Sequence, residues 1–151
     1  MTRKHLIWVA VGLLAITAYP IATHYAGTFW FTWKTEHRAG QNALDCGHAV
    51  VGPDPSATVR CVNESLNLRR PFHAIFEHKG IDSSVATGVA RSRDGSITLL
   101  RYDSNPGGIC LVLCFAQITE QKCTRASVEA SKLAPVVPFW SVKLRCDEPG
   151  A

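Results

Sequence analysis

The chain has 151 residues, of which 16 are Lys or Arg and 12 are Asp or Glu, so its formal net charge is +4. Two of the basic residues, Arg3 and Lys4, stand at the extreme N-terminus, and the rest of the chain is nearly neutral. No run of basic residues is interleaved with aromatic ones, which argues against a nucleic-acid partner. The residues beyond position 33 suffice for one domain and are too few for two.

An apolar run from Leu6 to Trp33 contains no Lys, Arg, Asp or Glu. As a helix it would be roughly 40 Å long, more than the ~30 Å hydrocarbon core of a bilayer. We therefore predict a cytoplasmic tail and transmembrane anchor over residues 1–33, with the rest outside the cytoplasm, facing the periplasm from a bacterial inner membrane. The alternative is a signal peptide that is cleaved near Gly27.

Aromatic side chains gather at the far end of this run and are followed by Lys34 and Arg38. Aromatic residues followed by charge are typical of the headgroup boundary of a membrane helix. We expect five of them at the membrane interface: Tyr25, Phe29, Trp30, Phe31 and Trp33. Residues 34–45 are then expected to form a polar stalk between the membrane and the outer domain.

All six cysteines follow the predicted anchor: Cys46, Cys61, Cys110, Cys114, Cys123 and Cys146. An even number of cysteines in an exported domain indicates disulfides. We expect Cys46–Cys61 as a local clasp, and Cys123–Cys146 as a clamp on the last hairpin-like segment. Cys110 and Cys114 remain unassigned.

Two other uses of these cysteines are less well supported by their spacing. A redox motif would have C-x-x-C, whereas this chain has C-x-x-x-C from Cys110 to Cys114. A zinc site would use Cys46 and His48, yet no second ligand pair follows at a suitable spacing. We expect no metal and no cofactor.

The expected outer domain, residues 46–151, begins with one helix. Asp54 can cap a helix that starts at Pro55 and runs to Arg70. Its apolar face carries Val59, Val62 and Leu66.

After Pro71 the apolar period changes to two, which is typical of strands. Strands are expected over residues 72–77, 84–92, 96–102, 110–118 and 139–146, with a hairpin turn at Asp94-Gly95. Residues 127–138 are expected to form a loop. The predicted fold is α+β: an N-terminal transmembrane helix, then one helix packed on an antiparallel meander of four to five strands.

One arrangement of motifs extends over residues 46–104. It consists of Cys46-Gly47, Cys61, Arg70-Pro71-Phe72, Gly80-Ile81-Asp82-Ser83, Asp94-Gly95 and Tyr102-Asp103-Ser104. It resembles that of small exported or membrane-anchored bacterial proteins of no assigned function. The resemblance implies no activity and no catalytic residue.

The chain contains no nucleophile elbow, phosphate-binding loop, zinc-protease motif or dinucleotide-binding glycine set. His73 and His78 are five residues apart, so on one strand they would point to opposite faces. The favoured hypothesis is a noncatalytic, membrane-anchored binding or structural module whose partners are the membrane and another envelope protein. The alternatives are a small hydrolase-like enzyme that uses Asp82 or Asp103, and a thiol-redox protein.

Overall fold

A computed structural model describes residues 8, 25–80, 83–106, 116–134 and 137–147, with the backbone alone at 132–134 and 137–140. A helix covers residues 25–39, called helix 25–39 below, and a second helix is α2 (Ser56–Asn67). The strands are β1 (Leu44–Ala49), β2 (Phe72–Lys79), β3 (Ser84–Arg91), β4 (Ile97–Asp103), β5 (Gln117–Cys123), β6 (Arg125–Ala134) and β7 (Val137–Asp147).

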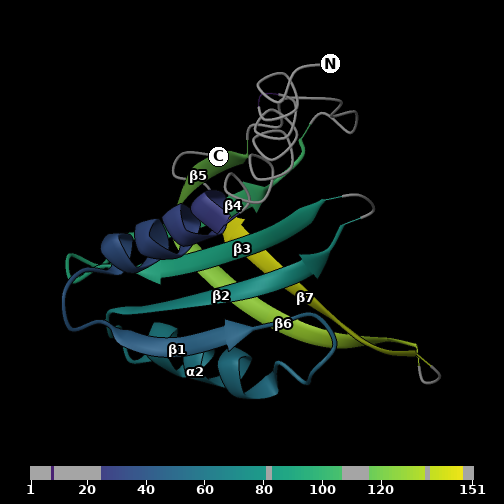
Figure 1. Ribbon diagram of the computed structural model, residues 1–151. Helices are drawn as coiled ribbons and strands as arrows, with labels where there is room; N and C mark the ends of the chain where they lie inside the picture. Colours follow the sequence, from purple (N-terminus) through teal and green to yellow (C-terminus); the bar gives the residue numbers. More distant parts are fainter. Residues whose placement is uncertain (1–7, 9–24, 81–82, 107–115, 135–136, 148–151) are drawn as a thin grey trace.

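The main sheet has five strands in the order β1-β2-β3-β4-β5 (Figure 1). Strands β2 to β4 confirm the first three strands of the predicted antiparallel meander, which continues into β5. The predicted strand over residues 139–146 lies in β7, outside this sheet, and β1 joins β2 in parallel and makes the sheet mixed. Strands β6 and β7 form a separate antiparallel pair. The fold is therefore α+β, as expected, with two helices among the described residues.

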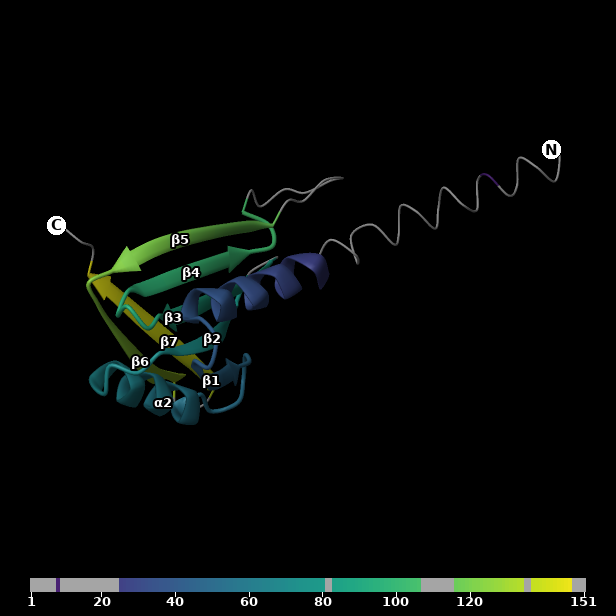
Figure 2. The same cartoon turned by 90° about the vertical axis from the view of Figure 1, so that its left-hand side faces the viewer.

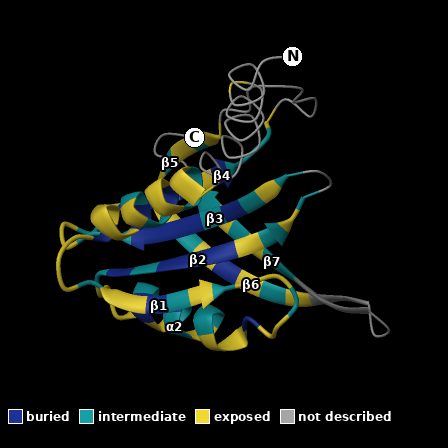
Figure 3. Ribbon diagram, in the orientation of Figure 1, coloured by how far each residue is buried: buried dark blue, intermediate teal, exposed yellow. Residues whose placement is uncertain are grey.

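The two faces of the sheet are covered by different elements (Figures 1 and 2). Helix 25–39 lies on one face, and α2 and the β6–β7 pair lie on the other. Figure 3 shows the buried residues concentrated in the central strands, between these layers. Alternation along β2 explains this arrangement, because Phe72, Ala74 and Phe76 face α2 whereas Ile75 faces helix 25–39.

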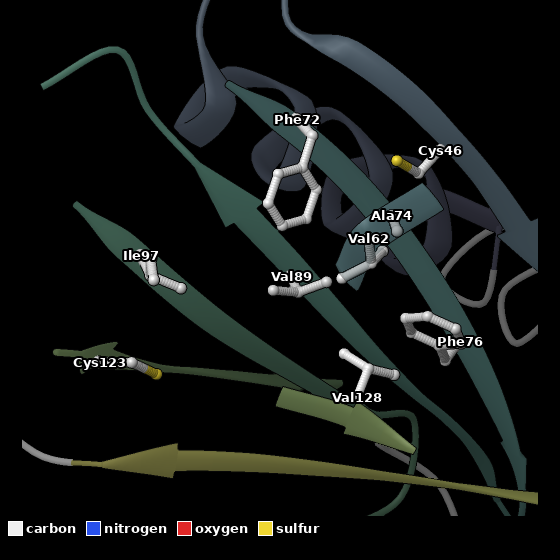
Figure 4. Packing of buried hydrophobic residues seen from close by; sticks show 9 residues of the cluster. All are labelled: Cys46, Val62, Phe72, Ala74, Phe76, Val89, Ile97, Cys123 and Val128. Atoms are coloured by element: carbon white, nitrogen blue, oxygen red, sulfur yellow. The ribbon is translucent and has the colours of Figure 1, made fainter. Parts of the chain in front are cut away.

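The larger core lies between the sheet, α2 and β6 (Figure 4). Val62 is fully buried at its centre, and Val59 and Leu66 pack beside it, which confirms the predicted apolar face of the helix. The side-chain amide of Asn63 donates a 2.9 Å hydrogen bond to the backbone carbonyl of Val128 and so fixes α2 against β6.

The limits of α2 differ slightly from the prediction. The helix begins at Ser56, with Pro55 rather than Asp54 at the N-cap position, although the Asp54 carboxylate accepts a 2.9 Å hydrogen bond from the Ser56 amide. It ends at Asn67 rather than Arg70. Arg69 adopts φ 54°, and the Arg70 amide bonds back to the Ser65 carbonyl at 2.9 Å. This closing turn ends the helix before Pro71 is reached.

Three predictions about elements need correction. Residues 34–39 are helical and Thr35 and Ala39 are buried, so this part of the expected stalk is packed against the sheet. Residues 44–49, expected as the end of the stalk and the start of a loop, form β1 around a bulge where Gly47 has φ +98°. Residues 127–134, expected as a loop, belong to β6, because pairing with β7 satisfies their backbone groups.

Other predictions concern residues that the structure does not describe. The anchor over residues 1–33 is described only at Trp8 and from Tyr25 onward, and most of the expected strand over residues 110–118 is likewise outside the described residues. Among the residues that are described, no helix combines the length and the apolar character needed to cross a membrane.

Candidate functional site

Two disulfides connect the layers of the domain. Cys46–Cys61 joins β1 to α2 with its Cα atoms 5.5 Å apart, and Cys123–Cys146 joins β5 to β7 at 5.3 Å. These are the two pairs that the sequence predicts. All four described cysteines are therefore oxidised and offer no thiol for redox chemistry, while Cys110 and Cys114 lie outside the described residues.

The aspartates considered for catalysis do not form a described site. Asp103 Oδ1 accepts a 2.9 Å hydrogen bond from the Asn105 amide, so this carboxylate stabilises the turn after β4. The neighbouring Ser104 hydroxyl accepts a 2.8 Å bond from the Ser84 amide and extends the pairing of β3 with β4. Asp82 lies outside the described residues.

The two histidines of β2 are separated as expected. His78 lies on the α2 side of the sheet, where its Nε2 is 2.9 Å from Thr87 Oγ1. Burial, and secondarily the charge of Arg101, lower the pKa of His78. His73 lies on the opposite face, with Nε2 3.4 Å from Asp45 Oδ1. In the described part of the chain, no group of three or more His, Cys, Asp or Glu side chains is placed to hold a metal ion.

Helix 25–39 has two distinct faces. Tyr25, Phe29, Trp30 and Trp33 have exposed fractions between 41% and 72% on its outer side, where Trp30 and Trp33 stack at 4.7 Å. Phe31, the fifth aromatic residue expected at the membrane interface, differs from these four because it is only 2% exposed. It packs instead on the sheet, with its ring 5.5 Å from that of Tyr102.

The inner face of helix 25–39 fits closely on β3. A Cβ atom at Gly88 would stand 2.5 Å from Thr35 Oγ1 and 3.2 Å from Phe31 Cζ. Thr35 is fully buried, and its hydroxyl donates to the Phe31 carbonyl at 2.9 Å. Side chains of the helix therefore occupy the space that a side chain at position 88 would need.

Ion pairs fix the second half of the same helix. Lys34 Nζ and Arg38 Nη2 lie 2.5 Å and 2.7 Å from the two carboxylate oxygens of Glu120 on β5. These two cations, led by the hydrogen bond from Lys34, lower the pKa of Glu120. The helix is therefore held both by packing at its centre and by charge near its end.

An open cleft of about 340 Å³ lies where the first half of helix 25–39 meets the sheet. The residues that line it include Thr28, Thr32, Ile75, Ser84, Ala86 and Tyr102. They come from the helix and from three strands, which explains why no single stretch of sequence indicated a site. The cleft is near the lower end of the ~300–1,000 Å³ range of small-molecule sites.

Buried apolar side chains and exposed polar ones both line this cleft. Phe31, Ile75 and Ala86 are buried. His48 and Glu77 pair at 3.0 Å (Nε2 to Oε1), and their side chains are 47% and 39% exposed. The lining therefore combines apolar side chains that are nearly closed off with polar side chains that are accessible.

Tyr102 is the distinctive residue of the cleft. Its side chain is 1% exposed, and its hydroxyl has no hydrogen-bond partner among the described residues. Burial raises its pKa, and the neighbouring charge of Asp103 adds to this effect, so the phenol remains protonated. The hydroxyl lies against helix 25–39 at Gly27, so it is a buried hydrogen-bond donor that is closed off from the cleft.

A second cleft, of about 400 Å³, lies on the other face of the sheet and is lined by His78, Arg101, Val142 and Leu144, among others. His78 already contacts Thr87 there. The first cleft is the stronger candidate because it lies where helix 25–39 meets the sheet and combines side chains of four strands with those of the helix. Comparison with known proteins adds no relative: no family model, curated protein or solved structure matches the chain.

Proposed function

We propose that the protein is a noncatalytic binding or structural module that is anchored in a membrane, with its disulfide-bonded domain outside the cytoplasm. The observation that carries this proposal is the two-faced helix 25–39. Its inner face is locked to the sheet through Phe31 and Thr35, while its outer face exposes four large aromatic side chains. Residues 25–33 of this helix also belong to the charge-free run of the sequence.

Physical considerations support a membrane position for the outer face. Large exposed aromatic clusters are unfavourable in water and suit the headgroup region, where rings pack against acyl chains and polar ring atoms stay hydrated. Arg3 and Lys4 before the run favour retention of the N-terminus in the cytoplasm. Another envelope protein is a suitable partner, because anchoring raises the local concentration of the domain near membrane proteins.

The disulfides support an extracytoplasmic location. Disulfides persist in oxidising compartments such as the periplasm and are rare in the cytosol. The two described bonds connect β1 to α2 and β5 to β7, so both are integral to the domain.

The test is extraction and chemical analysis of the full-length protein from membranes. We expect it to stay in the membrane pellet at alkaline pH, to begin at Met1 or Thr2, and to have no thiol that reacts before reduction. Recovery in the soluble fraction with a start near Gly27 would contradict anchoring. Thiols that react without reductant would contradict the location.

A Trp30→Ala/Trp33→Ala variant tests the outer face of the helix, with Leu68→Ala, at an exposed position after α2, as its control. Only the Trp30→Ala/Trp33→Ala variant should bind bilayers less firmly than the unchanged protein.

A further inference from the structure

We propose that the second cleft, between β7 and strands β2, β3 and β4, binds a small organic anion in which one acidic head group is joined to one apolar group. This inference gives the proposed binding module a class of ligand. It depends on the folded domain alone, so it can fail while the proposed membrane position holds, and the membrane position can fail while it holds.

The cleft results from the course of β7. This strand runs diagonally across the sheet on the side of α2 (Figures 1 and 2). Near its end the Cys123–Cys146 disulfide ties it to β5, whereas Val142 and Leu144 lie opposite residues of β2, β3 and β4. A cleft of about 400 Å³ is left between β7 and these three strands.

Every described residue that lines this cleft is accessible to a ligand. Lys79 and Arg101 are exposed, and the others are half-buried: His78, Val85, Thr87, Leu99, Val142 and Leu144. In the first cleft, by contrast, Phe31, Ile75 and Tyr102 are at most 4% exposed. A ligand can therefore reach the walls of the second cleft without separating the packed layers of the domain.

The charged side chains of the lining all have the same sign. Lys79 and Arg101 are cationic, and no Asp or Glu is among the described lining residues. Burial lowers the pKa of the neighbouring His78, and the charge of Arg101 lowers it further, so this positive charge acts on the interior of the cleft. An anion is the ligand that complements such a lining.

Arg101 is the group best suited to hold the acidic head. Its guanidinium has five donors in a planar fork that matches the oxygens of a carboxylate or a phosphate. Asp103 follows on the same face of β4, but its carboxylate accepts a hydrogen bond from the Asn105 amide. Among the described residues no carboxylate forms an ion pair with Arg101, so a ligand would displace water and not an existing partner.

The apolar part of the lining determines the rest of the ligand. Val85 and Leu99 come from the sheet, and Val142 and Leu144 come from β7. A small inorganic anion would leave these four side chains in contact with water, whereas an apolar group would cover them. Because an apolar cavity of about 150 Å³ accommodates benzene, 400 Å³ has room for a ring, a short linker and the acidic head.

The test is titration of the full-length protein, in a mild detergent, with 3-phenylpropanoate, while the valine and leucine methyl groups are observed by NMR. We expect binding with Kd on the order of 1 mM, the range for a ligand of this size. The methyl signals that shift should be those of the lining: Val85, Leu99, Val142 and Leu144. Val59 and Leu66 of α2, outside the described lining, serve as controls. Unshifted lining signals, or equal shifts of the controls, would overturn the site.

Two related probes separate the parts of the ligand. The amide 3-phenylpropanamide has the shape of the acid without its charge, and propanoate has the head without the ring. Each should bind at least about tenfold more weakly, which corresponds to ~1.4 kcal/mol. Equal binding of the amide would refute the role of charge, and equal binding of propanoate would refute the role of the apolar walls. Phenyl phosphate distinguishes the two acidic heads: tighter binding than that of 3-phenylpropanoate assigns a phosphate monoester, and weaker binding assigns a carboxylate.

Variants of Arg101 test its role directly. Arg101→Gln, at an exposed position, should keep the fold, weaken 3-phenylpropanoate about tenfold and leave the binding of the amide unchanged. Arg101→Lys keeps the charge but loses the planar fork, so its Kd should lie between the two. The matched control Arg125→Gln, at an exposed position of β6 outside the described lining, should bind as the unchanged protein does. Undiminished binding of 3-phenylpropanoate by Arg101→Gln would refute the proposal; if this variant does not fold, the comparison of acid and amide on the unchanged protein still decides.

Discussion

Replacing Gly88 by alanine tests whether helix 25–39 is a fixed part of the domain. Gly88 is a buried residue of β3 that faces this helix. A new Cβ would lie 2.5 Å from Thr35 Oγ1 and 2.9 Å from Thr35 Cγ2, closer than atoms tolerate. The helix or the strand must therefore shift for the alanine to be accommodated.

The sign of the effect is informative. In a strand without a close neighbour, glycine is less favourable than alanine by about 0.5–1 kcal/mol, so Gly88→Ala would stabilise the protein. With the helix in place, overpacking should instead cost about 1–3 kcal/mol. Thr35 cannot easily relieve the clash, because it is β-branched and its hydroxyl is bonded to the Phe31 carbonyl.

The assay is urea unfolding of the full-length protein in a mild detergent, followed by tryptophan fluorescence. Gly88→Ala should lower the unfolding midpoint with little change in slope. Thr35→Ala removes both of the closest atoms, so adding it to Gly88→Ala should recover about 1 kcal/mol relative to the sum of the single changes. A Gly88→Ala protein that is more stable than wild type, with no coupling to Thr35, would refute the packing described here.

Three further predictions concern charge and the second disulfide. Glu120 has a lowered pKa in the folded protein, so the stability that its ion pairs add to the fold is fully present above its unfolded pKa of about 4.3. It should be lost as the pH falls through the lower folded value, and Glu120→Gln should flatten acid unfolding curves only below about pH 5. His78 also has a lowered pKa, so stability should decline as the pH falls below about 6.5, where the unfolded chain takes up the proton first. His78→Gln should remove this slope below about pH 6.5, and an unchanged slope would show that another group is responsible. The Cys123→Ser/Cys146→Ser variant opens a link with a sequence separation of 23, so unfolding in urea should become easier by about 3 kcal/mol; a loss well under 1 kcal/mol would count against this clamp.

Much of the strand structure was predictable because it is local. Phe72, Ala74 and Phe76 alternate with polar or differently directed residues, and Asp94-Gly95 forms the turn between β3 and β4. Gly95 acts through its backbone, which has φ +88°, whereas the Asp94 carboxylate accepts hydrogen bonds from the Ser96 amide and hydroxyl. Such signals need no knowledge of distant segments.

Pairing with distant segments decided other elements. Residues 125–134 contain Glu, Ala, Ser and Lys, which gave no clear strand signal, yet they form β6 because β7 pairs with them. Residues 44–49 include Gly47 and contain no clear alternation. They become β1 through pairing with β2 and the bond from Cys46 to Cys61.

The candidate site could not be read from the sequence, because its parts are far apart along the chain. Thr28, Ile75, Ala86 and Tyr102 come from four elements, and each alone is an ordinary residue of a helix or strand. The unpaired state of the Tyr102 hydroxyl depends on what surrounds it in space. No spacing rule connects these positions.

The sequence by itself determined the β2–β4 hairpins and the apolar face of α2, because local periodicity and turn chemistry act over short distances. Only the tertiary structure decided the role of residues 25–39. Their aromatic residues look alike in sequence, yet Phe31 is buried on the sheet while Trp30 and Trp33 remain exposed. The reason is physical: Gly88 leaves space on β3 for one side of the helix, and which side that is depends on a strand roughly fifty residues away.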